Sequence, residues 1–366
     1  MTPQPRRRSA TLSNPPVLSR GVPRSAPVAF TDLLTQSLTL RAPLMQSRRT
    51  QAFRAFSGGA DGLDGVFIDV YAQGATLVVY EGRPPRTFDP VRAATEALEV
   101  LRPIGVRAVY LKPFAKDRSR LGGELPPVVT DPAPAAGESL PESILITEHH
   151  WKLEVRLYDG LSTGLFLDQR DNRAWVSKWC AEHQRTRGRP ARVLNTFAYT
   201  CAFSIAAAMG SADATSVDVS ARYLDWGKRN FSHNSLDAGV AEGKHRFARM
   251  DTFEFFSYAR RKQLTYDLII LDPPSFAAGS KKKGIPAWSA VDDYARLVRE
   301  AAGLLAPGGK SVILASTNTA ELCRPGRLER EISRGLGRDP QALKLPDPPI
   351  DFARDRDRFA ARAFVV

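Results

Sequence analysis

The sequence predicts an α/β protein with a Rossmann-like, doubly wound and mostly parallel sheet, preceded by a small α+β domain. From residue 192 onward, apolar runs typical of strands alternate with helix-like segments, as parallel sheets with crossover helices require. Residues 268–271, Leu-Ile-Ile-Leu, contain no polar side chain, which is typical of a strand buried on both faces. Asp272, Pro273 and Pro274 follow at once, and the proline pair ends the strand because proline cannot donate to a sheet ladder.

The elements of this second half can be placed from periodicity and turn signals. Strands are expected at residues 193–195, 214–219, 245–251, 267–272 and 311–315. Helices are expected at residues 201–209, at 221–233, beyond Thr252, and at about 289–305. Thr252 is a favourable N-cap, and Pro307 with two following glycines stops the last helix.

The first 150 residues divide into an extension and a small domain. Residues 1–30 contain five arginines and no acidic residue, so we expect a disordered basic extension. An organellar transit peptide is the alternative there, and without one we expect a cytoplasmic protein. Residues 31–150 predict a small α+β domain that orients the substrate and contains a Pro/Gly-rich linker, and residues 151–366 form the larger domain. The expected elements of the small domain are strands 67–71 and 75–80 joined through Gln73-Gly74, a helix at 90–101 and a strand at 107–111.

Composition narrows the class of function. The chain of 366 residues is 43% hydrophobic and 25% charged, and no apolar run approaches the ~18 residues that span a bilayer. A net charge of +13 favours a polyanionic partner such as nucleic acid. Cys180, Cys201 and Cys323 are odd in number and far apart, and the five histidines lack metal-ligand spacing. Neither a disulfide framework nor a metal site is expected.

Three carboxylates, Asp218, Asp251 and Asp272, fall at the carboxyl ends of successive strands, where open α/β sheets bind ligands. Asp272 is followed by the stiff proline turn and then by the ring of Phe276, a combination suited to holding a planar base. The alternative for this peptide alone is a strand stop with a solvated aspartate.

The turn after the first strand favours a cofactor that carries a ribose but no phosphate. Asp218 lies 23 residues after Asn195, close to the ~20-residue spacing at which an acid meets a ribose hydroxyl. Residues 195–202 contain no glycine, and no Walker lysine is present, so a pyrophosphate could not approach the backbone. S-adenosylmethionine is a cofactor of this kind.

Several motifs occur together in one order. They are Gly164-Leu-Phe-Leu-Asp-Gln-Arg170, Asn195-Thr-Phe-Ala-Tyr-Thr200, Ser216-Val-Asp-Val-Ser220 with Tyr223-Leu-Asp-Trp226, Leu271-Asp-Pro-Pro-Ser-Phe276 and Ala315-Ser-Thr-Asn318. With them, residues 160–366 resemble the class I methyltransferases that modify large-subunit ribosomal RNA. Residues 31–150 more faintly resemble the small domain that precedes the catalytic domain in these enzymes.

The resemblance implies a cofactor site for S-adenosylmethionine. Asp218 would bind the ribose, and Asp251 would lie by the adenine amine. Cys201 departs from the family, because many relatives have glycine there, and a thiol could narrow the backbone cradle. The other implied cofactor residues are Asn195, Phe197 and Ala198 on the methionine side, and Thr163 and Gln169, which would close over the cofactor.

The methylated atom depends on a cysteine. The cytosine-C5 branch of the family carries a nucleophilic cysteine in a Ser-Cys-Ser motif, where this chain has Ser316, Thr317 and Asn318. Cys323 lies beyond that motif, so cytosine C5 chemistry is disfavoured. The nearest resemblance is to the guanine-N7 domain of the bifunctional enzyme, and N7 has a free lone pair that needs only in-line positioning.

The same resemblance implies a substrate site. Asp272 would accept hydrogen bonds from the base edge, the carbonyls of Pro273 and Pro274 would shape the pocket, and Phe276 would stack on the flipped base. Asn318 would bind substrate, and Lys281, Lys282 and Lys283 would contact phosphates; a solvated loop is the alternative for these lysines.

The sequence therefore predicts an S-adenosylmethionine-dependent RNA methyltransferase that acts on a base nitrogen of large-subunit rRNA. Methylation of DNA or protein through the same pocket is one alternative, because Asp-Pro-Pro-aromatic is not specific for RNA. A non-catalytic RNA-binding or ribosome-assembly factor that retains the fold is the other.

Overall fold

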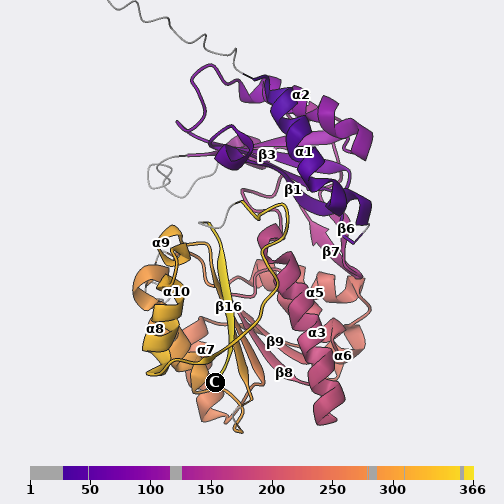
Figure 1. Cartoon of the computed structure of the whole chain (residues 1–366). Coiled ribbons are helices and arrows are strands. Elements are labelled where there is room, and N and C mark those ends of the chain that lie inside the picture. The colour runs from indigo at the N-terminus through magenta and orange to yellow at the C-terminus, as the bar shows by residue number, and fades with distance from the viewer. Residues whose placement is uncertain are drawn as a thin grey trace, which may run out of the picture.

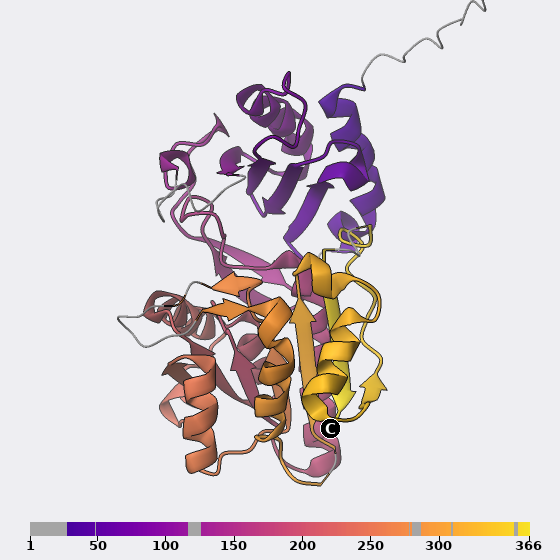
Figure 2. The same ribbon diagram turned by 90° about the vertical axis from the view of Figure 1, so that its left-hand side faces the viewer.

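The computed structural model describes residues 28–354 and 358–366, apart from 48, 116–125, 278, 280–286 and 309. A smaller N-terminal domain lies at one end of the molecule, and a larger domain built on a seven-stranded sheet lies at the other (Figure 1, Figure 2). Up to residue 27 the expected basic extension falls outside the described residues, and helix α1 begins at Phe30.

The N-terminal domain is a mixed five-stranded sheet with two helices packed against it. The hairpin expected at residues 67–71 and 75–80 is confirmed, because β2 and β3 pair antiparallel up to the Tyr71–Gly74 pair. Asp89 accepts hydrogen bonds from the amides of Val91 and Arg92, which fixes the start of α2 where the sequence predicts it. In spatial order the strands are β1 (Ala52–Ser57), β2 (Val66–Tyr71), β3 (Gly74–Tyr80), β4 (Ala108–Phe114) and β5 (Ala136–Gly137). The helices are α1 (Phe30–Ser47) and α2 (Pro90–Leu101), with single 3₁₀ turns at Gly58–Asp61, Arg102–Ile104 and Pro127–Val129.

A hairpin joins the two domains. Its strands, β6 (Ile144–Glu148) and β7 (Trp151–Val155), pair antiparallel around a turn in which His149 has a φ of 56°. The boundary expected at residue 150 lies in this turn. Trp151, the first residue of β7, is buried, and its ring lies 5.2 Å from that of His149 in the turn, so these two residues pack together.

The larger domain has the expected doubly wound sheet. Its order is β10-β9-β8-β11-β14-β16-β15, in which the first five strands are parallel to one another and β16 pairs antiparallel with both β14 and β15. The strands are β8 (Arg192–Thr196), β9 (Asp213–Asp218), β10 (Arg246–Arg249), β11 (Leu268–Leu271), β14 (Val312–Thr317), β15 (Gln341–Leu343) and β16 (Ala360–Val365). A short ribbon beside them pairs β12 (Phe276–Ala277) with β13 (Trp288–Ser289).

Helices cover both faces of this sheet. They are α3 (Arg170–Arg187), α4 (Ala202–Met209), α5 (Ala221–His233), α6 (Asp237–Ala241), α7 (Thr252–Arg261), α8 (Ala290–Ala302), α9 (Ala320–Cys323) and α10 (Arg327–Leu336), and a 3₁₀ turn, η5 (Leu167–Gln169), precedes α3. Leu268 and Ile270 pack with α3 and α4, whereas Ile269 and Leu271 pack with α7, α8 and α10. Burial on both faces explains why this strand has no polar residue.

One helix start differs from the sequence prediction. Asp251, not Thr252, is the N-cap of α7, because its side chain accepts hydrogen bonds from the amides of Phe253 and Glu254. The expected strand 245–251 is correspondingly shorter, ending at Arg249. An aspartate caps a helix as well as a threonine does, so the sequence pattern could not choose between the neighbours.

The chain order places a crevice at the centre of the sheet. From β8 the chain winds outward through β9 to β10, and it then crosses back to β11 on the other side of β8. Crossover helices leave the sheet in opposite directions at such a switch point, so ligands bind at the carboxyl ends of these strands. Those ends face the N-terminal domain (Figure 2).

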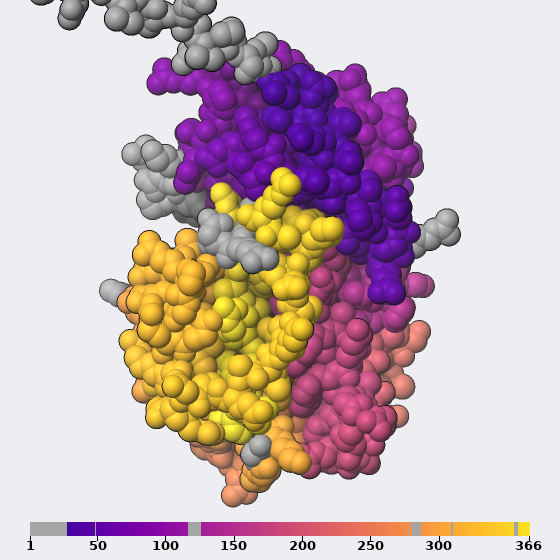
Figure 3. Space-filling view, viewed as in Figure 1, coloured from indigo at the N-terminus to yellow at the C-terminus, as the bar shows by residue number. Residues whose placement is uncertain are grey.

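Residues 344–354, which follow β15, reach the junction between the domains, where Figure 3 shows yellow chain against the indigo domain. Asp351 is buried, pairs with Arg170 and accepts a hydrogen bond from the amide of Arg54 at 2.9 Å. Arg170 also donates to the carbonyl of Ala52 at 3.2 Å. The first residue of α3 is thereby fixed to the N-terminal domain.

Candidate active site

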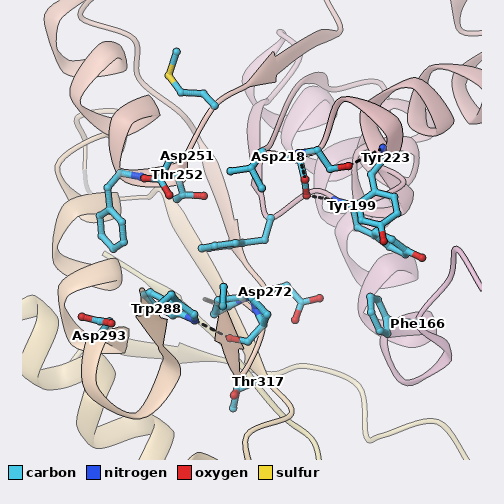
Figure 4. A pocket seen from close by; sticks show the side chains of 18 of the residues that line it. Phe166, Tyr199, Asp218, Tyr223, Asp251, Thr252, Asp272, Trp288, Asp293 and Thr317 are labelled. Carbon is cyan, nitrogen blue, oxygen red and sulfur yellow. Dashed lines mark hydrogen bonds between the residues drawn. The ribbon is translucent and has the colours of Figure 1, made fainter. Parts of the chain in front are cut away.

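A cavity of about 960 Å³ opens at the carboxyl ends of β8, β9, β10 and β11 (Figure 4). Its volume lies at the upper end of the range of about 300–1,000 Å³ that holds small-molecule ligands. The predicted site residues that line it are Gln169, Phe197, Asp218, Asp251, Asp272, Pro273, Pro274 and Asn318.

Asp218 anchors the turn that follows β8. Its Oδ2 accepts a hydrogen bond from the amide of Tyr199 at 2.9 Å, and its Oδ1 accepts one from the amide of Ser220 at 2.8 Å. Burial raises the pKa of Asp218, and the two amides oppose that rise. Each carboxylate oxygen keeps a second lone pair, so the side chain can still accept from hydroxyl donors in the cavity.

The turn itself has a strained backbone. Phe197, Tyr199 and Cys201 have φ values of 52°, 50° and 65°, in the left-handed region that non-glycine residues rarely adopt. Strain of this kind is concentrated at functional sites. The amide of Ala198 donates to the carbonyl of Val217 at 2.9 Å, which ties the turn to β9.

Asn195 and Ala198, which the resemblance implies for the methionine side of the cofactor, are buried in β8 and in the turn that follows it. Asn195 is buried, and its Nδ2 donates to Oγ of Ser204 at 2.9 Å. Ala198 is also buried, and neither side chain is among those that line the cavity.

The thiol of Cys201 points away from the cavity. A Cβ atom built on Gly227 of α5 would lie 2.4 Å from its Sγ, so the thiol fills the space that this glycine leaves. Cys201 is fully buried and is not among the lining residues. The cysteine therefore does not narrow the cavity in this structure.

Asp251 caps α7 and lines the cavity. Its Oδ1 accepts from the amides of Phe253 and Glu254 at 2.9 and 3.3 Å. Asp251 therefore has a structural role as a helix cap, and its Oδ2 takes no part in these two bonds. Met250 and Phe253 line the cavity beside it and supply apolar surface for a flat ring.

Asp272 lies at the end of β11 and is held from two sides. Its Oδ1 accepts hydrogen bonds from Nε2 of Gln169 at 3.0 Å and from Oγ of Ser316 at 2.7 Å. Burial raises its pKa, whereas these two bonds lower it. The proline turn is fixed by Trp288, whose Nε1 donates to the carbonyl of Pro274 at 2.7 Å (Figure 4).

Gln169 and Thr163, the two residues expected to close over the cofactor, have different positions. Gln169 lines the cavity, and its amide is oriented by Asn172, which donates to Oε1 at 2.9 Å. Thr163 is buried at the domain junction, where its Oγ1 donates to the hydroxyl of Tyr71 at 2.8 Å. Thr163 thus joins the segment before α3 to the N-terminal domain.

The expected substrate residues are only partly brought together. Phe276 is 66% exposed and is not among the lining residues, whereas Trp288 and Phe197 stand beside the proline turn with ring centroids 5.9 Å apart. Asn318 lines the cavity and accepts from Oγ of Ser275 at 2.8 Å. Lys281, Lys282 and Lys283 lie outside the described residues.

Sequence reasoning missed Asp168, which lies between Phe166 and Gln169 in the segment before α3. It lines the cavity, and its Oδ1 is buried without a hydrogen-bond partner. Burial, and then the charge of Asp272, raise the pKa of this carboxyl to about 6. Its place in the Gly164–Arg170 motif was a signal that pointed to it.

Aromatic residues of the wall were also missed, because the sequence pattern places them in helices and turns rather than at strand ends. Tyr199 and Tyr223 stack edge to face with centroids 4.5 Å apart. The lining residues of this kind are Phe166, Tyr199, Tyr223, Phe253 and Trp288.

The site fits S-adenosylmethionine in size and chemistry. Asp218 offers free lone pairs to hydroxyl groups, and the pocket by Asp251 offers apolar surface to an adenine. The orphaned Oδ1 of Asp168 marks a place where a polar ligand group is needed. In the part of the chain that the structure describes, no group of three or more His, Cys, Asp or Glu residues could hold a metal ion, and no described helix is long and apolar enough to cross a membrane.

Comparisons with known proteins identify the family of the chain. The family described as S-adenosylmethionine-dependent methyltransferase matches residues 132–351. "Putative ribosomal RNA large subunit methyltransferase YwbD" of Bacillus subtilis is 38% identical to this chain, over 80% of the chain and 67% of the relative. "Ribosomal RNA large subunit methyltransferase I" of Aeromonas salmonicida is 31% identical, over 86% of the chain and 74% of the relative.

Another relative is much longer than this chain. "Ribosomal RNA large subunit methyltransferase K/L" of Hahella chejuensis is 33% identical over 79% of the chain, which spans 36% of that protein. Among solved structures, that of SMU.776, titled "a putative methyltransferase complexed with SAH", has a TM-score of 0.76 and is 31% identical in sequence. The match covers 94% of this chain and 83% of the chain in that structure. From its fold, its site and these relatives, the chain belongs to the family of S-adenosylmethionine-dependent methyltransferases and is an enzyme of that class.

Proposed function

We propose that the protein methylates a base nitrogen of large-subunit ribosomal RNA, with guanine N7 as the favoured atom. The relatives described above are named as ribosomal RNA large subunit methyltransferases, which supports the substrate class. The proposal for the atom is carried by one observation: no cysteine is among the residues that line the cavity.

That observation bears directly on the chemistry. Methylation at carbon 5 of a pyrimidine needs a thiolate that first adds to the ring. Thr317 lines the cavity at the position where the cytosine-C5 branch has its cysteine. Cys180 and Cys201 are buried with pKa values raised by burial, and Cys323 is buried with its Sγ directed at the carbonyl of Thr317.

Methylation of a base nitrogen does not need a nucleophilic side chain in the site. When bound, the cofactor supplies the methyl group of its sulfonium, and the N7 lone pair can attack that carbon without prior loss of a proton. The residues then need to position the base in line and to stabilise the positive charge that it gains. Asp272 can do both, because its Oδ1 is fixed by Gln169 and Ser316 while the carboxylate lines the cavity.

Arginines at the rim supply contacts for the RNA backbone. Arg222, Arg249 and Arg296 line the cavity, and the guanidinium of Arg296 lies 4.1 Å from the ring centroid of Phe253. Arg249 forms no ion pair with any residue that the structure describes, so its charge is available to a phosphate. Contacts of this type predict binding that weakens as salt rises.

Labelled S-adenosylmethionine, incubated with the protein and unmodified large-subunit rRNA, tests the proposal when the nucleosides are analysed by mass spectrometry. We expect 7-methylguanosine, and its loss in Asp272→Asn. A 5-methylcytosine product would contradict the argument from the missing thiol. Parallel reactions with DNA and protein test the alternative substrates.

A further inference from the structure

We propose that Asp168 is the residue that recognises the α-ammonium group of S-adenosylmethionine, and that Asp272 shares the charge of that group from the neighbouring strand end. The inference rests on the cofactor occupying the cavity described above, and it is independent of the RNA target.

The geometry begins with an incomplete hydrogen-bond network. Gln169 donates from Nε2 to both Asp272 and Ser316 and accepts at Oε1 from Asn172. Both N–H donors of its amide therefore have partners within the protein. The adjacent Asp168 lines the same cavity with an Oδ1 that is buried and has no partner. A buried acceptor of this kind is costly unless a ligand donates to it.

The strand order indicates which end of the cofactor reaches this acceptor. Asp251 follows β10 and Asp218 ends β9, so adenine and ribose occupy the β10–β9 side of the cavity. The cofactor then extends past β8 to the end of β11, where Asp272 and the bonded segment of Gln169 lie. The amino-acid end is therefore the part that comes next to Asp168.

The electrostatics favour a cation over a neutral donor. The charged groups that act on Asp168 are Asp272, Arg54, Arg173 and Asp69. Arg173 is bonded to Glu148 through two contacts of 2.6 Å, and Arg54 is bonded to Asp69 at 2.8 and 3.1 Å. Both arginines are thus bonded to other carboxylates, and their charges lower the pKa of Asp168 less than burial and Asp272 raise it.

Among the described residues, therefore, the Asp168–Asp272 pair has no cation of its own. Two carboxyls that share a site hold one proton at a raised pKa, or they bind a positive charge. The N–H edge of a base is neutral and leaves that charge uncompensated. An ammonium group supplies both the charge and three N–H donors.

Calorimetry without RNA tests the inference with three ligands, S-adenosylmethionine, S-adenosylhomocysteine and 5′-methylthioadenosine. The last keeps the adenine, ribose and thioether but lacks the amino-acid end. For Asp168→Asn we expect the Kd of the first two ligands to rise about tenfold or more, as for a lost charge-assisted hydrogen bond. The Kd of 5′-methylthioadenosine should change less than about twofold, because it never reaches Asp168.

Glu254→Gln is the matched control. Glu254 lines the same cavity at the opposite end, on α7, so its substitution removes the same charge. Glu254→Gln should change the Kd of ligands with and without the amino-acid end by the same factor. Asp168→Glu keeps the charge, so it should retain the preference for ligands that carry an ammonium group. If Asp168→Asn fails to fold, the comparison of Asp168→Glu with the wild type tests the inference instead.

Lowering the pH gives an independent readout. Protonation of Asp168 below about pH 6 should weaken the ligands with an ammonium in the wild type and leave 5′-methylthioadenosine less affected. Asp168→Asn should lose that part of the pH dependence, while Asp272 continues to titrate.

Two results would overturn the inference. Equal weakening of all three ligands would make Asp168 a residue that only supports the cavity. Unchanged cofactor binding together with impaired methyl transfer to RNA would place the base, and not the ammonium, at Asp168. A wrong RNA target would leave every one of these binding measurements unaffected.

Discussion

Gln169 and Asp272, 103 residues apart in the sequence, are joined by a hydrogen bond of 3.0 Å from Nε2 to Oδ1. The donor precedes α3, and the acceptor ends β11. The next residue, Arg170, pairs with Asp351 at the domain junction. The orientation of the pocket carboxylate thus depends on how the two domains fit together.

We expect Gln169→Ala to lower kcat by about tenfold or more, because Asp272 loses a donor that fixes its rotamer. A hydrogen bond to the charged form of an acid lowers its pKa, so removal should raise the pKa of Asp272 further. The acidic limb of the pH–rate profile should then move to higher pH. If kcat falls without any change in that limb, the bond does not act through the charge of Asp272.

Asp168→Asn should stabilise the free protein at pH 7.5. The folded protein raises the pKa of Asp168 from 3.8 to about 6, so ionisation costs stability as pH rises through that range. Allowing for the opening of the cavity to solvent, we expect a gain of about 1–2 kcal/mol at pH 7.5.

The pH dependence of this gain is the internal control. Near pH 4 the folded wild-type carboxyl is protonated, and the advantage of the asparagine should largely vanish. Thermal unfolding of both proteins at pH 7.5 and near pH 4 measures this difference in stability. An advantage that stays constant with pH would arise from packing and not from the charge.

Asp351→Ala should destabilise the protein by about 3–5 kcal/mol, because it leaves the buried guanidinium of Arg170 without its partner. The same substitution frees the amide of Arg54, so the two domains should separate more easily. Glu242→Gln, which breaks the exposed ion pair with Lys244, should leave Tm unchanged. Comparable losses in both variants would mean that the junction is no more important than a surface pair.

Cys201 and Gly227 should behave as a coupled pair. Gly227→Ala should cost about 2–3 kcal/mol and weaken cofactor binding, because its Cβ would lie 2.4 Å from Sγ of Cys201. Cys201→Gly accommodates the φ of 65° and removes the thiol, so the double variant should recover at least about 1 kcal/mol. Additive effects in this double-mutant cycle would contradict the contact.

Regular elements with strong local signals were predicted well. The helices at residues 90–101 and 221–233 have the observed bounds, and the buried strand at 268–271 is confirmed. The β2–β3 hairpin is confirmed as well. Their signals are short-range: a cap, a proline stop, a hairpin turn or an unbroken apolar run.

Other elements had no such signal. Helix α1 contains Pro43, and strand β1 carries Arg54 in its centre, so neither was assigned. Strands β15 and β16 add an antiparallel edge next to β14, and only contacts with that strand define them. Phe276 was expected in the pocket, yet it is exposed. It belongs to the β12–β13 ribbon, where it pairs with Ser289, and this pairing and not the proline turn sets its position.

The sequence by itself determined the alternation of strands and helices from residue 192 to residue 315, and with it the carboxylates that follow successive strands. This follows because apolar periodicity and proline stops are local properties of the chain. Only the tertiary structure decided that Asp168 lies unpartnered in the cavity with Asp272, and that the thiol of Cys201 points at Gly227. Burial and partners of a side chain are set by segments far away in sequence, so no local pattern contains them.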